Sequence, residues 1–153
     1  MEIPTLGEEE KQKLFTEMWL GSMMGPMGFI MRKLGPEALE ELNEETAQAC
    51  AADMKERGVD DALKFAMNYG IVNKNIFGSD VEVEGNPGKA ILDVKRCSNL
   101  ETALRFAEKG MPITKEQHCS SCINGYFRRV AENLGLVLDV EFSDKGCKMT
   151  ISK

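Results

Sequence analysis

The spacing of apolar residues changes partway along this chain of 153 residues, and the change restricts the folds open to it. Across residues 1–75, apolar side chains recur every three or four positions, which is the period of one helix face. Across residues 78–153, two stretches alternate between apolar and polar side chains, which is the period of a strand. A chain of this length is short for two independent cores, so we expect a single domain whose N-terminal half is helical.

Three helices are predicted in the N-terminal part. The first runs from Gly7 to Leu34, and Gly25-Pro26 predicts a kink in it or a division into two shorter helices, because proline removes a backbone hydrogen bond. The second begins at Pro36 and continues to about Arg57, with Gly58 ending it. The third spans roughly residues 60–69 and has Asp60 or Asp61 as its cap.

Two hairpins are predicted in the C-terminal part. The first turns at residues 85–88, between alternating runs that begin at Val81 and end at Lys95. The second turns at residues 143–146, between Leu136 and Ile151, and places Cys147 on the face of Met149 and Ile151. Further helices are expected at 99–109 and 126–134. The order predicts an α+β fold with a four-stranded, largely antiparallel sheet and helices packed on one face.

Charge and composition exclude several classes of function. The 25 acidic residues outnumber the 19 basic ones, which argues against a nucleic-acid partner because binding of that kind depends on phosphate neutralisation. No run of residues is apolar enough for a membrane span, and the start of the chain lacks the pattern of a signal peptide. We therefore expect a cytoplasmic protein, where the odd number of five cysteines argues against a disulfide framework.

Four cysteines form the main candidate site: Cys97, Cys119, Cys122 and Cys147. The pair in Cys119-Ser-Ser-Cys122 can present both thiols to one point, either from one helix face or from a metal-binding turn, and the following Asn124-Gly125 permits the turn. Cys97 follows one predicted strand and Cys147 opens another. Strict alternation would turn Cys97 away from Cys147, so a bulge or a break near Arg96 is required.

Three interpretations of these thiols remain open from the residues alone. They bind zinc, they hold an iron-sulfur cluster of the 4Fe-4S type, or they stay unligated with a redox-active or merely buried Cys119/Cys122 pair. His118, the only histidine, is a possible replacement for one thiolate or a hydrogen-bond partner to one. Cys50 falls on a line of apolar residues in the second predicted helix, so we expect it to be buried and outside the site.

A second candidate site lies in the methionine-rich first helix. Flexible thioethers adapt to irregular apolar shapes, so this helix could line a pocket for a small apolar ligand. The residues predicted to line the pocket are Trp19, Met23, Met24, Met27 and Met31. An apolar stripe with Gly21, Gly25 and Gly28 nearby is equally typical of core packing or of a homodimer interface.

Several short motifs together resemble the vinyl-reductase-type small-molecule-binding superfamily, and in particular its branch named for L-2-amino-thiazoline-4-carboxylic acid hydrolase. The motifs are Lys33-Leu34-Gly35-Pro36-Glu37-Ala38, Val94-Lys95-Arg96-Cys97, His118-Cys119-Ser120-Ser121-Cys122 and Gly146-Cys147-Lys148-Met149-Thr150-Ile151. The resemblance implies an α+β fold with a four-stranded antiparallel sheet, a dimer, an internal cavity for small or lipid-like molecules, and C-terminal cysteines that serve metal or ligand binding.

Three functions are therefore considered, beginning with the one that the sequence supports best. The first is a cytoplasmic small-molecule-binding or sensing domain with a cysteine-ligated metal centre. The second, suggested by the resemblance, is a metal- or thiolate-dependent hydrolase of a small C–N or C–S heterocycle. Members of that branch often carry an acidic residue soon after the middle cysteine, where this chain has a second cysteine, and this departure counts against thiazoline ring opening. The third is an iron-sulfur or dithiol redox protein.

Overall fold

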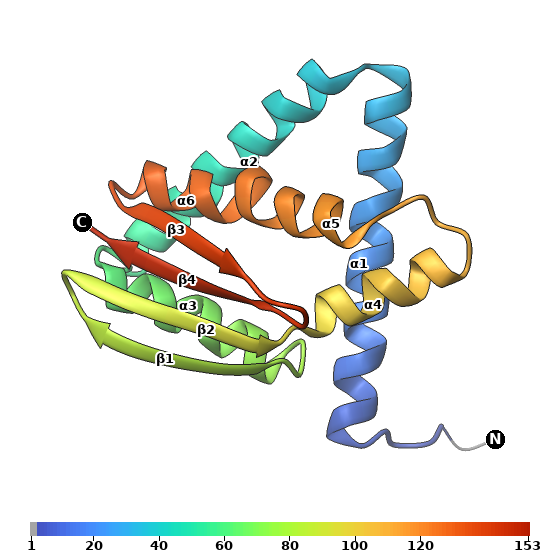
Figure 1. Ribbon diagram of the computed structural model, residues 1–153, viewed down its shortest axis with the longest axis horizontal. Helices are drawn as coiled ribbons and strands as arrows, with labels where there is room; N and C mark the ends of the chain where they lie inside the picture. Colours follow the sequence, from blue (N-terminus) through green and yellow to red (C-terminus); the bar gives the residue numbers. More distant parts are fainter. Residues whose placement is uncertain (1–2) are drawn as a thin grey trace.

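The computed structural model describes residues 3–153 and shows an α+β domain, as predicted (Figure 1). Its elements in chain order are α1 (Glu8–Lys33), α2 (Pro36–Glu56), α3 (Ala62–Asn75), β1 (Asp80–Asn86), β2 (Lys89–Arg96), α4 (Ser98–Glu108), α5 (Lys115–Cys122), the π-helix η1 (Ile123–Phe127), α6 (Arg128–Asn133), β3 (Val137–Phe142) and β4 (Cys147–Ser152). The two predicted hairpins are β1–β2 and β3–β4.

The four strands form one antiparallel sheet in the order β1-β2-β4-β3, so the two hairpins join through β2 and β4. In that central pairing Leu92 lies opposite Met149 and Ala90 opposite Ile151, and all four side chains are buried. Cys147 lies opposite Val94 and shares the face of Met149 and Ile151, which confirms the register predicted for the last strand.

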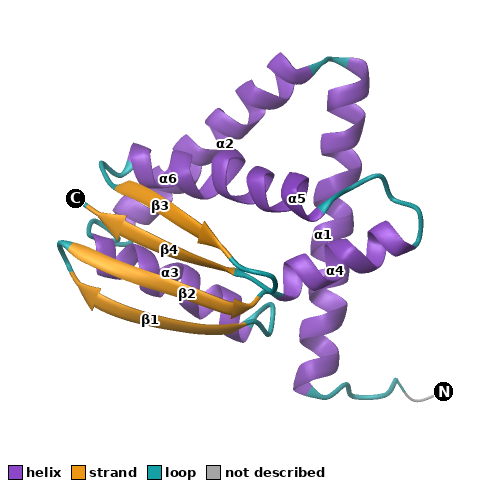
Figure 2. Ribbon diagram, in the orientation of Figure 1, coloured by secondary structure: helices purple, strands orange, loops and turns teal. Residues whose placement is uncertain are grey.

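Helices cover one face of the sheet and leave the other open (Figure 2). The helix α3 packs against β1 and β2, α6 packs against β3, and α2 lies over α6 and η1. The core between these layers includes the fully buried side chains of Phe65, Val130 and Ile151. The open face carries charged residues such as Glu82 and Lys148, as expected for a sheet face in contact with water.

The first helix is not divided at Gly25-Pro26, because α1 continues through Pro26 as one helix. Ser22 and Pro26 are both exposed, so water can satisfy the carbonyl that the missing N–H of Pro26 leaves free. Only Thr16 and Leu20 of α1 are buried, and the helix stands at the side of the sheet domain. Among residues 3–153, no helix combines the length and the apolar character that crossing a membrane requires.

The third helix is also longer than predicted and extends to Asn75. Asp61 caps its start by accepting a hydrogen bond from the Lys64 backbone, as expected. At its other end the amide of Gln12, from α1, donates to the backbone carbonyls of Lys74 and Asn75. This partner from a distant part of the chain satisfies two of the carbonyls that the end of any helix leaves free, and no local pattern predicts it.

Arg129 joins α6 to α2 through ion pairs with Glu40 and with Glu44, the latter at 3.1 Å. Hydrogen bonds from Gln48 and Arg129 hold the pKa of Glu44 below its usual value of 4.5. We expect Arg129→Met to lower the Tm by roughly 2–4 °C at pH 7. A carboxyl whose pKa is lowered by folding stabilises the fold above its unfolded pKa and loses that effect as pH falls. The Tm difference from wild type should therefore shrink below pH 4.5, as thermal melts across pH 3–8 would show.

The control for this prediction is Lys13→Met, which removes a charge from an exposed position on α1. It should leave the Tm within about 1 °C of wild type at every pH. An Arg129→Met difference that is constant from pH 3 to pH 8 would contradict the role given to the Glu40 and Glu44 carboxylates.

Candidate functional site

Cys97 lies at the junction of β2 and α4, just outside the strand. The strand ends at Arg96, and Cys97 is the N-cap of α4, with its sulfur accepting a hydrogen bond from the backbone N–H of Leu100 at 3.4 Å. The break that the alternation required near Arg96 is therefore present. It frees Cys97 from the side-chain alternation of the strand, and the thiol packs against the core.

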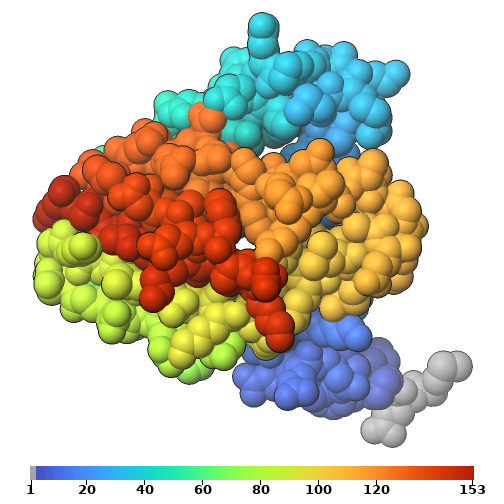
Figure 3. Space-filling model, in the orientation of Figure 1, coloured from blue at the N-terminus to red at the C-terminus, as the bar shows by residue number. Residues whose placement is uncertain are grey.

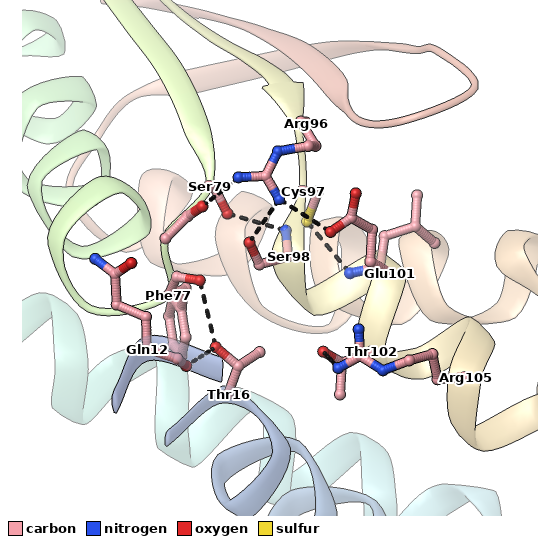
Figure 4. A network of polar contacts seen from close by, with 12 residues as sticks. Gln12, Thr16, Phe77, Ser79, Arg96, Cys97, Ser98, Glu101, Thr102 and Arg105 are labelled. Carbon is pink, nitrogen blue, oxygen red and sulfur yellow. Dashed lines mark hydrogen bonds and ion pairs between the residues drawn. The ribbon is translucent and has the colours of Figure 1, made fainter. Parts of the chain in front are cut away.

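A polar network holds this junction in place (Figure 4). The guanidinium of Arg96 donates to the backbone carbonyl of Gly78 at 2.6 Å and to Glu101 at 2.9 Å. The backbone N–H of Ser98 donates to the hydroxyl of Ser79, just before β1. The start of α4 is thus tied to the segment before β1, which fixes the position of the Cys97 backbone.

The tip of the β3–β4 hairpin brings the other two cysteine-bearing segments to this junction. The backbone N–H of Cys97 donates to the carbonyl of Lys145 in the hairpin turn at 2.8 Å. On the other side, Lys115 of α5 lies 3.8 Å from the carboxylate of Asp144 in the same turn. Because Cys147 opens β4 directly after this turn, the junction, the hairpin tip and α5 are neighbours.

Cys119 and Cys122 lie in the last turn of α5, so the CxxC segment is helical and the alternative metal-binding turn is not formed. The hydroxyl of Thr114 caps the helix by accepting a hydrogen bond from the backbone N–H of Gln117. In turn, the side-chain oxygen of Gln117 accepts a hydrogen bond from the backbone N–H of Thr114. Asn124-Gly125 continues the helix as part of η1 instead of breaking it. A π-helical turn widens the helix locally and is frequent at functional sites.

The four thiols influence one another electrostatically. Burial raises the pKa of Cys97, Cys119, Cys122 and Cys147, most strongly at Cys122, and raises that of Cys147 to about 12. After burial, the charges of the other three cysteines are the further causes that raise the pKa of Cys122. All five cysteines of the chain are free thiols, and without a bound cation these four stay protonated at neutral pH.

The thiols are neighbours but do not converge on one point. Within residues 3–153, no three side chains among the cysteines, His118 and the carboxylates are disposed to hold a single metal ion. His118 is half-buried in α5, and burial alone lowers its pKa, which favours the neutral form that ligates metals. The predicted ligand set, with His118 as its possible member, therefore stays a prediction.

Two tyrosines beside Cys122 were not anticipated. Tyr69 of α3 and Tyr126 of η1 are the only tyrosines of the chain, and their rings meet edge to face at 6.1 Å. Burial, followed by the thiol of Cys50, raises the pKa of Tyr126 to about 12. The hydroxyl of Tyr69 is buried and forms no hydrogen bond of good geometry among the described residues, although the hydroxyl of Tyr126 lies close enough to raise the pKa of Tyr69. Tyr126 follows Cys122 by four positions, a spacing that could have signalled it, whereas Tyr69 has no local signal.

The methionines of α1 differ in exposure. Met23, Met24 and Met27 are half-buried, whereas Trp19 and Met31 are exposed. One hollow lies on the open face of the sheet and another at the β1–β2 turn, and α1 lines neither, so the pocket at α1 stays a prediction. Cys50 is half-buried against the core, as Cys97, Cys122 and Cys147 are, so its place outside the ligand set stays a prediction.

Comparison with known proteins assigns no family. A scan against protein-family models finds no match, and a search of curated proteins finds no significant relative. The fold and the arrangement of the cysteines are therefore the basis for a functional assignment.

Proposed function

We propose that this protein is a small-molecule-binding or sensing domain whose Cys97, Cys119, Cys122 and Cys147 bind one metal centre, either zinc or a 4Fe-4S cluster. One observation carries the proposal: backbone and ion-pair contacts of the β3–β4 turn, through Lys145 and Asp144, join all three cysteine-bearing segments. Free thiols at every cysteine fit a reducing compartment, so we propose a cytoplasmic location.

The chemistry of the donor set supports a metal. Burial raises the pKa of all four thiols, and Arg96 and Lys115 offset this only in part at Cys97 and Cys119, so a bound cation would stabilise their thiolates. Binding would draw the thiols closer together than they lie here and would add its free energy to folding, because three separate segments would be held at one point. Such a centre would fix the hairpin tip and α5 onto the β2–α4 junction.

The redox-active form of the unligated Cys119/Cys122 pair has the least support. Reactive cysteines act as thiolates and have lowered pKa values, whereas burial raises the pKa of both Cys119 and Cys122. Zinc and iron-sulfur clusters both accept four thiolates, so a set of four cysteines does not distinguish one kind of centre from the other.

Elemental analysis of protein purified without oxygen tests the metal proposal. We expect either a colourless protein with about one zinc per chain or a brown one that absorbs near 400 nm and contains about four irons. Protein that folds fully and contains neither metal, even after incubation with zinc or after cluster reconstitution, would contradict the proposal.

The small-molecule part of the proposal is supported by Tyr69. Its buried hydroxyl forms no hydrogen bond of good geometry, and a ligand with one polar atom would supply one. The rings of Tyr69, Tyr126 and Phe127 pack against one another at centroid distances of 4.3–6.1 Å, so a ligand that reached Tyr69 would meet an aromatic surface.

One observation favours the hydrolase as a second candidate. Cys97, Cys122 and Cys147 pack against the core, but Cys119 is not among the residues that do so. Three fixed ligands and one exchangeable position are the pattern of catalytic zinc sites, where the open position activates water. If Cys119→Ser keeps its zinc and the protein hydrolyses a thiazoline carboxylate, the hydrolase replaces the binding domain as the better assignment.

A further inference from the structure

We propose that α1 is the interface of a homodimer in which two copies of this helix pack antiparallel around a two-fold axis at the level of Leu20. The surface concerned is the α1 stripe, defined by Glu8, Lys11, Phe15, Met18, Ser22, Gly25, Phe29 and Arg32. All eight residues are exposed. The proposal is independent of the metal centre.

The spacing of the α1 stripe is that of a coiled-coil seam. Its members follow one another at alternating intervals of three and four residues, so they form one continuous seam along the helix. Most of this seam is left uncovered by the rest of the domain, with Met18 66% and Phe29 54% exposed, and only Phe15 packs in part against Phe77. Figure 3 shows the N-terminal end of α1 projecting below the body of the protein, whereas the middle of α1 is hidden behind α4 and α5 in this view.

The α1 stripe is self-complementary in size when it is read in opposite directions. The spacing is symmetric about Leu20, so an antiparallel partner places Phe15 against Gly25 and Met18 against Ser22. Each large side chain then meets a small one. A Cβ at Gly25 would meet nothing within 4 Å in its own chain, so that space is open to a side chain from the partner.

The same register is complementary in charge. It places Glu8 opposite Arg32 of the other copy at both ends of the seam, and Lys11 beside the ring of Phe29. A parallel pair would instead place Glu8 against Glu8 and Arg32 against Arg32. Antiparallel packing also opposes the two helix dipoles, which is the favourable arrangement.

The apolar surface available is sufficient for a dimer. The large side chains on and beside the stripe are exposed by 44–66%: Leu14, Phe15, Met18, Trp19 and Phe29. At about half of 150–250 Å² each, they contribute roughly 500 Å² per protomer, or about 1,000 Å² in total. That total reaches the lower bound of about 1,000 Å² for a specific interface, before any polar contacts are counted.

The decisive variant is Ser22→Arg, examined in the purified full-length protein by sedimentation equilibrium between 1 and 100 μM. The hydroxyl of Ser22 bonds only locally, to the carbonyl of Trp19, and arginine is a better helix former than serine. We expect wild type to be dimeric and the variant to dissociate with a dissociation constant on the order of 100-fold higher, because two arginines would be buried near the axis.

Met31→Arg is the matched control. Met31 is an exposed apolar residue of the same helix, but its position falls outside the stripe. The Met31→Arg variant should stay dimeric. If wild type sediments as a monomer at 100 μM, or if both arginine variants dissociate equally, the proposal is overturned. Capture of detergent or lipid by a monomeric α1 would overturn it as well.

Charge exchange tests the antiparallel direction. Glu8→Arg alone and Arg32→Glu alone should each weaken the dimer severalfold, because each places like charges together twice. An equimolar mixture of the two variants should dimerise as well as wild type, since both ends then carry opposite charges. A parallel dimer would leave Glu8→Arg unweakened, and that result would contradict the register proposed here.

Discussion

Gly146→Ala is expected to destabilise the protein by about 3 kcal/mol or more and to lower its Tm by roughly 10 °C. A Cβ at Gly146 would lie 1.8 Å from the backbone carbonyl oxygen of Val94 and 2.9 Å from its carbonyl carbon. These are backbone atoms of β2, which is paired with a strand on both sides and cannot move away. The variant would push the hairpin tip, and Cys147 with it, off the β2–α4 junction.

Gly88→Ala is the control for this clash, because Gly88 lies in the turn of the other hairpin. A Cβ there would lie 3.4 Å from the side-chain oxygen of Asn86, which is a tolerable contact. Its effect should stay below about 1 kcal/mol. If the two variants melted at the same temperature, that result would contradict the close approach of the β3–β4 turn to β2.

Cys122→Ser is expected to abolish metal binding and the metal-dependent part of the stability. Metal binding to structural zinc sites contributes about 10–16 kcal/mol in small peptides, so the loss of one ligand should be visible in a larger fold. In wild type a strong chelator should lower the Tm. In Cys122→Ser the Tm should already be low and should not respond to the chelator, which separates metal loss from simple disruption of the core.

The same substitution at Cys50 is the control. Cys50 is half-buried against the core like Cys122, and it lies beside Tyr126. Cys50→Ser should keep the full metal content and the full response to the chelator. Equal metal content in both serine variants, measured after gel filtration, would contradict the proposed ligand set.

The local patterns of the sequence predicted the elements well where each element depends on its own residues. Alternating apolar residues predicted both hairpins, and Gly58, with φ of 77°, follows α2 as expected. Predictions failed where a distant partner or solvent decides the outcome. Pro26 is tolerated because its side of α1 faces water, and α3 is extended by Gln12 of α1.

In the candidate site, too, local patterns predicted some features, and contacts between distant segments decide the others. The break after Arg96 and the face of Cys147 followed from alternation, because side-chain direction along a strand is a local property. The π-helix after Cys122 and the approach of Tyr69 from α3 depend on how helices pack on the sheet, which no local spacing encodes. Convergence of the thiols is likewise a tertiary property, and it is the part of the account that measurement must decide.

The most direct measurement is X-ray absorption spectroscopy at the edge of whichever metal the protein carries after anaerobic purification. The account predicts a shell of four sulfur atoms at about 2.3 Å. Three sulfur atoms and one nitrogen at about 2.0–2.1 Å would assign the fourth position to His118. A shell of oxygen and nitrogen alone, or a fully folded protein that takes up no metal, would contradict the central claim that Cys97, Cys119, Cys122 and Cys147 form a metal centre.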